Sequence, residues 1–177
     1  MSDERPLLSL VMIVKNESRS IRETLASVKG HVDRCLVLDT GSNDGTQDLV
    51  RAAMEGVPGE LVEEKFVDFG TTRSRALELA GTQTVFTLML SGDETLVGGE
   101  ALRAFCEQHR DHADGAYNVQ IHFGATHYDH PRLARTDAGC IAPVSTIVLP
   151  VIPASTRPVT TIVSVPCVTR MRSASLA

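Results

Sequence analysis

The chain has 177 residues, 42% of them hydrophobic, and a formal net charge of −5 at pH 7. This length suits one domain with a substantial core, and the acidic balance argues against a nucleic-acid-binding surface, which needs a basic patch. The N-terminus lacks the basic-then-apolar order of a secretory signal, and no apolar run reaches membrane-spanning length. We therefore expect a cytoplasmic protein that binds no nucleic acid.

The cysteines point to the same compartment. They show no paired metal-ligand spacing, and two of them lie in apolar periodic segments, where a reduced, buried thiol is the ordinary case. The four residues are Cys35, Cys106, Cys140 and Cys167.

Apolar runs alternate with amphipathic segments over most of the chain. Residues 8–14 form a continuous apolar run, which is typical of a strand covered on both faces. Further strands are expected at residues 36–38, 61–66 and 85–90, with helices around residues 21–28, 49–53, 70–80 and 101–106. Such regular alternation predicts an α/β fold with a mostly parallel sheet and right-handed crossovers.

The stretch Leu36-Val-Leu-Asp39 ends in a carboxylate, and a turn containing Gly41 follows it before the next helix. Ligands of open α/β sheets bind at the carboxyl ends of strands, and turn N–H groups there can hold an anion or a ribose hydroxyl. Asp39 directly follows a buried run and needs a partner, which favours a functional role. Asp44 is at least as well suited to capping the following helix.

A second pair of acids, Asp93 and Glu94, follows the strand at residues 85–90. Carboxylates at one sheet edge suit a divalent cation that carries a phosphate-bearing ligand, although an exposed turn fits the pattern equally well. Arg73 falls in the first turn of the third helix, and its guanidinium matches phosphate oxygens. On pattern alone, a solvated arginine beside Arg75 is the better interpretation.

Four segments, in order, resemble the motifs of family 2 glycosyltransferases: residues 10–17, 37–46, 72–77 and 90–94. The resemblance covers about residues 8–137. It implies the GT-A fold, a Rossmann-like three-layer domain, and transfer of a sugar from a nucleotide-sugar donor with Mn²⁺ or Mg²⁺ as cofactor.

The resemblance also implies roles for individual residues. Asp39 and the end of the first strand would hold the nucleoside, Arg73 would approach the base or diphosphate, and Asp93 would bind the metal. Ser91 replaces the acid that the family usually has there, and a hydroxyl is a poorer ion ligand. The implied nucleotide-sugar-binding residues are Asn16, Asp39, Asp44, Arg73 and Ser91, and the implied metal ligands are Asp93 and Glu94.

Residues 109–137 are rich in histidine. The cluster His127-Tyr-Asp-His130 has the chemistry to bind a metal, but its weak periodicity favours a surface hairpin with exposed histidines. Residues 114–123 alternate loosely, as a strand would, and residues 131–135 resemble the family's next short strand.

The composition changes after Gly139. Residues 140–177 contain no Asp, Glu, Lys, Gly or aromatic residue but hold five of the eight prolines. We therefore divide the chain into a nucleotide-sugar-binding domain at residues 1–137 and an atypical tail at residues 138–177, which a frameshift would explain. The acceptor side of the fold is then truncated, and no general base can be named.

The expected function is sugar transfer to a glycan, lipid or protein acceptor, in cell-surface polysaccharide or lipopolysaccharide assembly, with peripheral membrane association compatible with that role. The alternative is a catalytically inactive remnant that still binds the nucleotide-sugar. A haloacid-dehalogenase-type phosphatase also begins with a strand-end Asp, but it needs an acid where this chain has Gly41.

Overall fold

The computed structural model describes residues 4–112, 115–123, 126–137 and 159–161. Residues 138–158 and 162–177, with Cys140 and Cys167, lie outside the described part. The division at residue 137 and the frameshift hypothesis therefore stay predictions.

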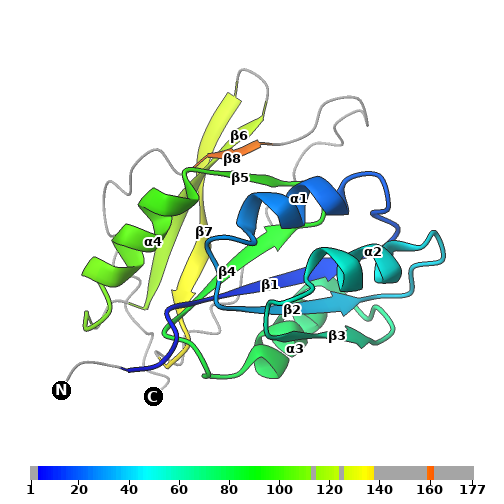
Figure 1. The fold of residues 1–177 in the computed structure, drawn as a ribbon, viewed down its shortest axis with the longest axis horizontal. Coiled ribbons are helices and arrows are strands. Elements are labelled where there is room, and N and C mark those ends of the chain that lie inside the picture. Colours follow the sequence, from blue (N-terminus) through cyan, green and yellow to red (C-terminus); the bar gives the residue numbers. More distant parts are fainter. Residues whose placement is uncertain (1–3, 113–114, 124–125, 138–158, 162–177) are drawn as a thin grey trace, which may run out of the picture.

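The described residues form one mixed sheet and four helices (Figure 1). The sheet order is β3-β2-β1-β4-β7-β6-β8-β5. β1 pairs in parallel with β2 and β4, β2 pairs in parallel with β3, and β7 joins β4 in antiparallel. The strands are β1 (Leu8–Val14), β2 (Arg34–Asp39), β3 (Gly59–Glu63), β4 (Phe86–Ser91), β5 (Thr95–Val97), β6 (Ala116–Phe123), β7 (Thr126–Arg135) and β8 (Val159–Thr161). The helices are α1 (Ile21–Val28), α2 (Thr46–Ala53), α3 (Phe69–Ala80) and α4 (Gly99–Gln108).

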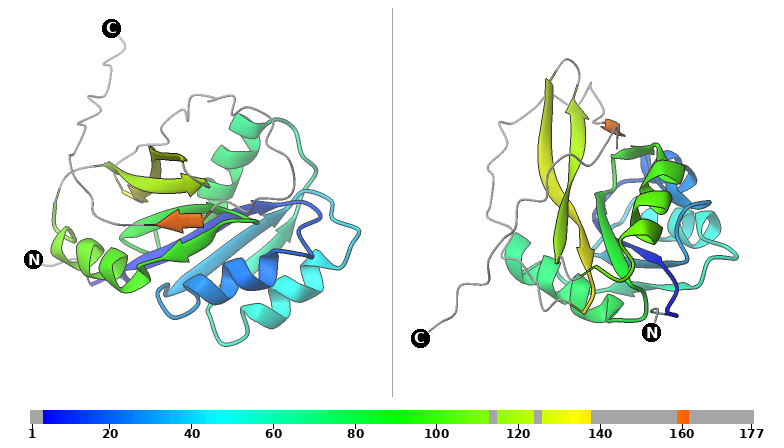
Figure 2. Two further views of the ribbon diagram at one scale, coloured as in Figure 1. Left: turned by 90° about the horizontal axis from the view of Figure 1, so that it is seen from above. Right: turned by 90° about the vertical axis from the view of Figure 1, so that its left-hand side faces the viewer.

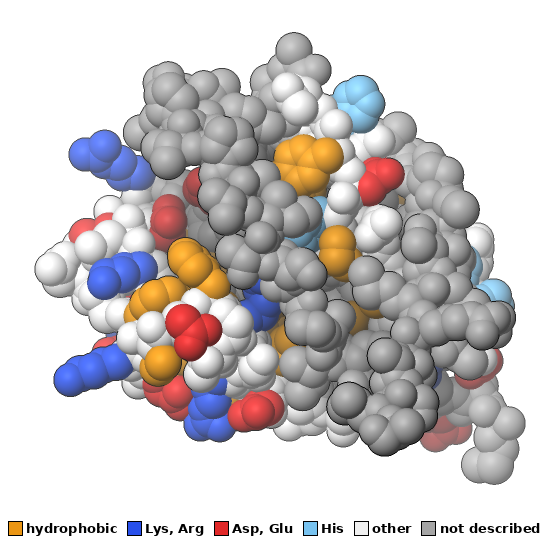
Figure 3. Space-filling view, turned by 180° about the vertical axis from the view of Figure 1, so that it is seen from behind, with side chains coloured by type: hydrophobic (Ala, Val, Ile, Leu, Met, Phe, Trp, Pro, Cys, Tyr) orange, Lys and Arg blue, Asp and Glu red, His pale blue; other side chains and the backbone are white. Residues whose placement is uncertain are grey.

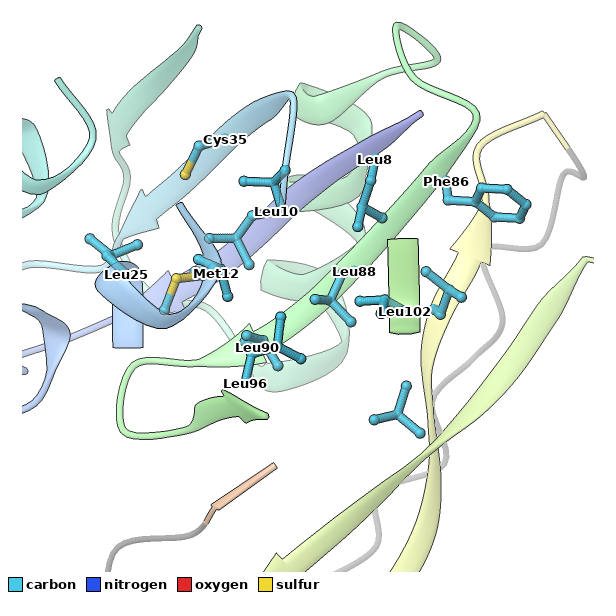
Figure 4. Packing of buried hydrophobic residues seen from close by; sticks show 14 of the residues in the cluster. Leu8, Leu10, Met12, Leu25, Cys35, Phe86, Leu88, Leu90, Leu96 and Leu102 are labelled. Carbon is cyan, nitrogen blue, oxygen red and sulfur yellow. The ribbon is translucent and has the colours of Figure 1, made fainter. Parts of the chain in front are cut away.

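Helices cover both faces of the sheet (Figure 2). One face packs Leu10, Met12 and Leu88 against apolar residues of α1, α2 and α4 (Figure 4). The other face packs Val11 and Leu36 against α3. Successive side chains of a strand point to opposite faces, so a continuous apolar run such as β1 supplies both layers. This is the predicted three-layer α/β fold with a mostly parallel central sheet, and the prediction is confirmed.

Two element boundaries differ from the prediction. A short strand, β5, intervenes between Glu94 and the next helix, and it is fixed by a 3.0 Å hydrogen bond from the Leu96 N–H to Ser27 Oγ. β3 ends at Glu63, because the segment predicted to extend it to Phe66 leaves the sheet as the connection to α3. The expected hairpin is present as β6 and β7, with residues 127–130 in β7.

Cys35 and Cys106 are buried free thiols, as predicted, and burial raises the pKa of each to about 12. Among the described residues, no helix combines the length and the apolar character that crossing a membrane requires.

Asp33 ties the start of β1 to α4. Its Oδ2 accepts hydrogen bonds from the N–H groups of Leu7 and Leu8 at 2.8 and 3.0 Å, and its Oδ1 accepts one from Arg103 at 2.9 Å. Burial alone would raise the pKa of this carboxyl, but the bonds from Arg103 and the two N–H groups outweigh it and hold the pKa below its usual value.

We predict that Asp33→Asn lowers the free energy of unfolding at neutral pH by about 1–3 kcal/mol, because it weakens a charge-assisted network. A lowered folded-state pKa gives stability that is present above the unfolded pKa of about 4 and is lost as the pH falls below it. Urea unfolding at several pH values should therefore show the variants converging in acid. The exposed Asp48→Asn is the control, and a deficit that stays constant with pH contradicts the account.

Candidate functional site

Three loops meet where β1, β2 and β4 end. In the parallel register, Val14 of β1 lies opposite Asp39 of β2, and Ile13 lies opposite Ser91 of β4. Asp39 and Ser91 therefore flank β1 at one edge of the sheet. The same edge holds the loops that follow these strands.

Asp39 is fully buried (0% exposed), yet only one of its carboxylate oxygens is satisfied. Oδ1 accepts hydrogen bonds from the N–H groups of Gly41 and Ser42, at 2.9 and 2.8 Å, and a longer one of 3.3 Å from Gln47 Nε2. Oδ2 is buried and has no hydrogen-bond partner among the described residues. Since buried polar atoms are nearly always hydrogen-bonded, this oxygen is able to accept a hydrogen bond from a group outside the described residues, such as a water molecule or a ligand.

Asn16 joins the loop after β1 to the loop after β2. Its N–H donates to Ser42 Oγ at 2.8 Å, and its Oδ1 accepts from the Asn43 N–H at 2.9 Å. Its φ of 57° lies in the left-handed region, which asparagine tolerates better than most residues. The side chain thus fixes the turn that carries Asp39's hydrogen-bond donors.

Asp44 makes a second connection between the same loops. Its Oδ2 accepts from the Ser18 N–H at 3.0 Å, and its Oδ1 accepts from the hydroxyl and N–H of Thr46 at 2.6 and 3.1 Å. The Thr46 hydroxyl, together with the other hydrogen bonds, holds the pKa of this carboxyl well below its usual range. Both oxygens are engaged just before α2, although the N-cap of that helix is Gly45 and not Asp44.

Residues 91–94, which we call the acidic loop, connect β4 to β5. Glu94 Oε2 accepts from the Ser91 N–H at 2.8 Å, and Thr24 Oγ1 donates to the Gly92 carbonyl at 3.0 Å. A β-carbon at Gly92 would lie 2.6 Å from Cγ of Glu17, so any larger residue would require the Glu17 side chain to move.

Asp93 is half-buried within this loop. No described residue donates a hydrogen bond to its carboxylate or forms an ion pair with it. Burial raises the pKa of neighbouring Glu17, and the charges of Asp93 and Asp44 raise it further, although a hydrogen bond from Ser20 opposes them. The loops after β1, β2 and β4 thus bring acidic groups close together.

Glu94 has a different environment from Asp93. Its Oε1 accepts from Arg132 Nη2 at 2.7 Å, and the two side chains are only 5% and 12% exposed. Burial raises the pKa of Glu94, while the charge of Arg132 and the Ser91 N–H act in the opposite direction. These two short contacts favour the ionised form. The sequence interpretation of Asp93 and Glu94 as an exposed turn therefore does not describe Glu94.

Arg132 is the site residue that the sequence analysis missed. On β6, Tyr117 pairs with Leu133 and the next residue, Asn118, pairs with Pro131, which leaves Arg132 as the extra residue of a β-bulge. A bulge redirects a side chain, and here Arg132 reaches the acidic loop. Nothing in the sequence pattern marks a bulge at this position.

Arg73 and Arg75 differ sharply, although both lie on α3. Arg75 is exposed and paired with Glu64 at 2.9 Å. Arg73 is half-buried and has no hydrogen bond or ion pair with any described residue. Burial lowers the pKa of Arg73, the charge of Arg132 adds to this effect, and Glu94 opposes it. The charges of Arg132 and Glu94 thus both act on the guanidinium of Arg73.

A hollow of about 640 Å³ lies between α3 and the segment after β3, lined by residues that include Leu38, Lys65 and Asp68. Exposed apolar residues, Phe66 and Phe69 among them, border this region, and apolar side chains lie among charged ones on the back face of the molecule (Figure 3). The lining contains neither Asp39 nor Asp93, so we assign the candidate site from the strand ends.

The predicted residues thus form two adjoining groups. The first surrounds the turn after β2, and the second surrounds the acidic loop, with Glu17 between them. The first group is Asn16, Asp39 and Asp44, and the second is Arg73, Ser91, Asp93 and Glu94.

A family model for glycosyl transferase family 2 matches residues 9–140. This chain belongs to that family. The family 2 match begins in β1 and continues through the acidic loop and β7, so it contains every residue of the two groups.

Two curated relatives match about half of this family 2 chain. A TPR repeat-containing protein of Synechococcus elongatus is 38% identical over 90 residues, which cover 51% of this chain and 21% of the relative. The glycosyltransferase SunS of Bacillus subtilis is 32% identical over 84 residues, which cover 47% and 19%. The aligned part is thus about a fifth of each relative.

Solved structures show the same fold. A mannosyltransferase of Pyrobaculum calidifontis, in complex with GDP-Man and Mn²⁺, has a TM-score of 0.54 at 23% identity and covers 66% of this chain and 36% of its own. TarS of S. aureus (residues 1–349), in complex with UDP-GlcNAc, has a TM-score of 0.52 at 20% identity, covering 62% and 32%. The chain matches about a third of each enzyme, and the likeness identifies its fold as GT-A.

The Glu94 and Arg132 pair yields a stability prediction. Removing either partner leaves a buried charge unpaired, so Glu94→Gln and Arg132→Gln should each lower the free energy of unfolding by about 3–5 kcal/mol. The double variant leaves no such charge and should lose much less than the sum of the two. Urea unfolding of the four proteins measures this coupling, and additive losses would show that the pair does not form.

Proposed function

We propose that this family 2 domain binds a nucleotide-sugar and serves in transfer of the sugar to an acceptor hydroxyl. The observation that carries the proposal is the unpartnered, buried Oδ2 of Asp39, at the same sheet edge as Asp93. The complexes of the related folds with GDP-Man and Mn²⁺ and with UDP-GlcNAc support a donor of this class.

The nucleoside is assigned to the first group of residues. Asp39 Oδ2 accepts a hydrogen bond from the base or the ribose, and such a bond would satisfy its buried oxygen. Asn16 and Asp44 hold the two loops in place, because their polar side-chain contacts are already made within the protein. Ser91, at the end of β4, offers a hydroxyl to the ribose.

Asp93 is the proposed ligand of a divalent cation, Mn²⁺ or Mg²⁺. Glu94 is less suited to this role, since its two oxygens are engaged by Arg132 and the Ser91 N–H. The described residues contain no group of three side chains able to hold a metal ion by themselves. They fit a cation that takes one carboxylate and completes its shell with diphosphate oxygens and water, the usual arrangement for Mg²⁺. When bound, such an ion neutralises charge on the diphosphate.

In sugar transfer, the acceptor oxygen bonds to the anomeric carbon of the sugar. The bond from that carbon to the diphosphate oxygen breaks in the same step, and the nucleoside diphosphate leaves. The acceptor hydroxyl loses its proton to a base. The residues of this edge position the donor, and Arg73 donates hydrogen bonds to the departing diphosphate. We propose a glycan, lipid or protein acceptor, in cell-surface polysaccharide or lipopolysaccharide assembly, with the reaction in the cytoplasm and the protein associated peripherally with the membrane.

A binding remnant without turnover is the second candidate. It would bind the donor through the same residues, and none of the residues described above is assigned as a general base. The two candidates differ in one assay, release of free nucleoside diphosphate from a bound donor. An active domain releases it faster than the uncatalysed donor does, whereas a remnant binds the donor and leaves it intact.

The first test concerns Asp39. Asp39→Asn should weaken binding of GDP-mannose or UDP-GlcNAc, whichever binds the unaltered chain, by about 1–3 kcal/mol. The carboxylate of Asp39 can accept hydrogen bonds at both oxygens, whereas the asparagine amide has only one oxygen that can accept them. Calorimetric titration measures the change, and circular dichroism checks that the variant folds. The exposed Asp48→Asn is the matched control, and equal affinity of Asp39→Asn and the unaltered chain would refute the nucleoside assignment.

The second test concerns the cation. Asp93→Asn should abolish the increase in donor affinity that Mn²⁺ produces, while affinity measured in EDTA stays unchanged and the fold stays intact. Titrations of the donor with Mn²⁺ and with EDTA give both values for the variant and the unaltered chain. If Asp93→Asn retains the full Mn²⁺ effect, the ion is held elsewhere.

A further inference from the structure

The connection from β3 to α3 exposes three large apolar side chains, Phe66, Val67 and Phe69, which we call the apolar patch. Their exposed fractions are 42%, 70% and 70%. Among the described residues, the only other large apolar side chain exposed to this degree is Val97, at 43%. Single exposed apolar residues are ordinary on a protein surface, whereas a contiguous group of them often serves an interaction.

The apolar patch is held in place at the start of α3. The rings of Phe66 and Phe69 meet edge to face, with their centroids 5.1 Å apart. Between them in the chain, Asp68 is the N-cap of α3, and its Oδ1 accepts a hydrogen bond from the Thr71 N–H at 2.8 Å. A surface that is already ordered loses little conformational entropy when it binds a partner.

The apolar patch begins at the sheet edge that carries the candidate site. Glu63, the last residue of β3, lies opposite Asp39 in the parallel register. The N–H of the next residue, Glu64, donates to the Asp39 carbonyl at 3.0 Å. Phe66 follows two residues later. A partner that docks on the patch therefore lies close to the edge to which we assign the donor.

The acidic side chains around the apolar patch are already engaged. Arg75 lies 2.9 Å from Glu64 and 3.7 Å from Glu78. Both carboxylate oxygens of Asp68 accept hydrogen bonds within the first turn of α3. Lys65, in contrast, is exposed and forms no ion pair with a described residue. Its ammonium group is thus free to meet a phosphate beside the apolar side chains.

The size of the apolar patch argues for a lipid surface as its partner. At these exposed fractions the three side chains offer about 300 Å² of area. A stable protein complex buries roughly 800 Å² on each partner, so the patch is too small for a second copy of the chain. Membrane affinity, in contrast, grows with whatever apolar area enters the acyl boundary, and a lysine adds attraction at the headgroups.

We propose that the apolar patch is a lipid-binding surface that holds the donor-binding edge against a membrane. This inference rests on the proposed function and deepens it, because it names the surface through which the peripheral association occurs. Binding needs no anionic lipid, since the apolar side chains supply most of the contact and the single free lysine can meet the phosphate of phosphatidylcholine.

Flotation of the full chain with phosphatidylcholine vesicles, in the absence of a donor, measures the binding. The double variant Val67→Ser/Phe69→Ser should lower the ratio of bound to free protein by roughly tenfold or more, because two large apolar side chains no longer leave water. Val97→Ser removes an exposed apolar side chain of β5 and is the matched control. It should bind as the unaltered chain does, and circular dichroism should show all variants folded, since these residues are exposed.

A second measurement locates the contact. The chain contains no tryptophan, so a single introduced one reports on its own surroundings. In Phe69→Trp, added vesicles should shift the emission to shorter wavelength, and lipids brominated in their acyl chains should quench it. Val97→Trp should show neither change. Emission of Phe69→Trp that is typical of a buried tryptophan before vesicles are added would show that the chain itself covers the patch, and would overturn the inference.

Other results would overturn it as well. One is the absence of flotation for the unaltered chain, and another is equal flotation of the unaltered chain and the double variant. A dimer that becomes a monomer in the double variant, measured by sedimentation, would assign the patch to a second copy. Loss of GDP-mannose or UDP-GlcNAc affinity in that variant without vesicles would assign it to the nucleotide. The proposed function fails separately, if neither donor binds the unaltered chain in the presence of Mn²⁺.

Discussion

The parallel pairing of β1 with both β2 and β4 is the constraint on which the candidate site depends. It places Asp39 and Ser91 at one sheet edge although they are far apart in the sequence. The pairing is stable because the strands are apolar on both faces and helices bury both. The core thus fixes the relative positions of the polar loops, and the loops need only short hydrogen bonds to complete the site.

Most of the hydrogen bonding at this edge serves to hold loops in place. Asn16 and Asp44 tie the loops after β1 and β2 together, and Glu94 closes the acidic loop on itself. Against this background, Oδ2 of Asp39 is buried without a hydrogen-bond partner among the described residues, and the half-buried guanidinium of Arg73 has no hydrogen bond or ion pair with them. The Asp39 oxygen is a hydrogen-bond acceptor and suits the donor groups of a nucleoside. The Arg73 guanidinium is a hydrogen-bond donor and suits the oxygens of a diphosphate.

The sequence predicted the alternation of strands and helices well, because fully buried strands have continuous apolar runs and helices have a clear period. It also placed Asp39 and Asp93 at strand ends, which follows from the same periodicity. Their grouping at one edge follows from the parallel strands that the alternation predicted, whereas residue spacing does not fix which strands are neighbours.

The prediction was weakest for side chains whose burial and pairing depend on contacts with residues far away in the sequence. Glu94 looks like an exposed acid in sequence, yet a partner 38 positions away buries it. Arg132 reaches it only through a bulge, and Arg73 differs from Arg75 in being half-buried and without the ion pair that Arg75 forms with Glu64. No local pattern distinguishes these cases. The short strand β5 was missed for a related reason, since three residues carry too little periodicity to be recognised.

The central claim is that a nucleotide donor binds at this sheet edge, and backbone amide signals report on it directly. In a ¹H–¹⁵N NMR titration of the unaltered chain with GDP-mannose and UDP-GlcNAc in the presence of Mg²⁺, we expect the signals of Gly41, Ser42 and Ser91 to shift together. The first two donate to Asp39, and the third donates to Glu94. Unchanged signals for these three residues, with either no shifts or shifts confined to other parts of the chain, would contradict the account.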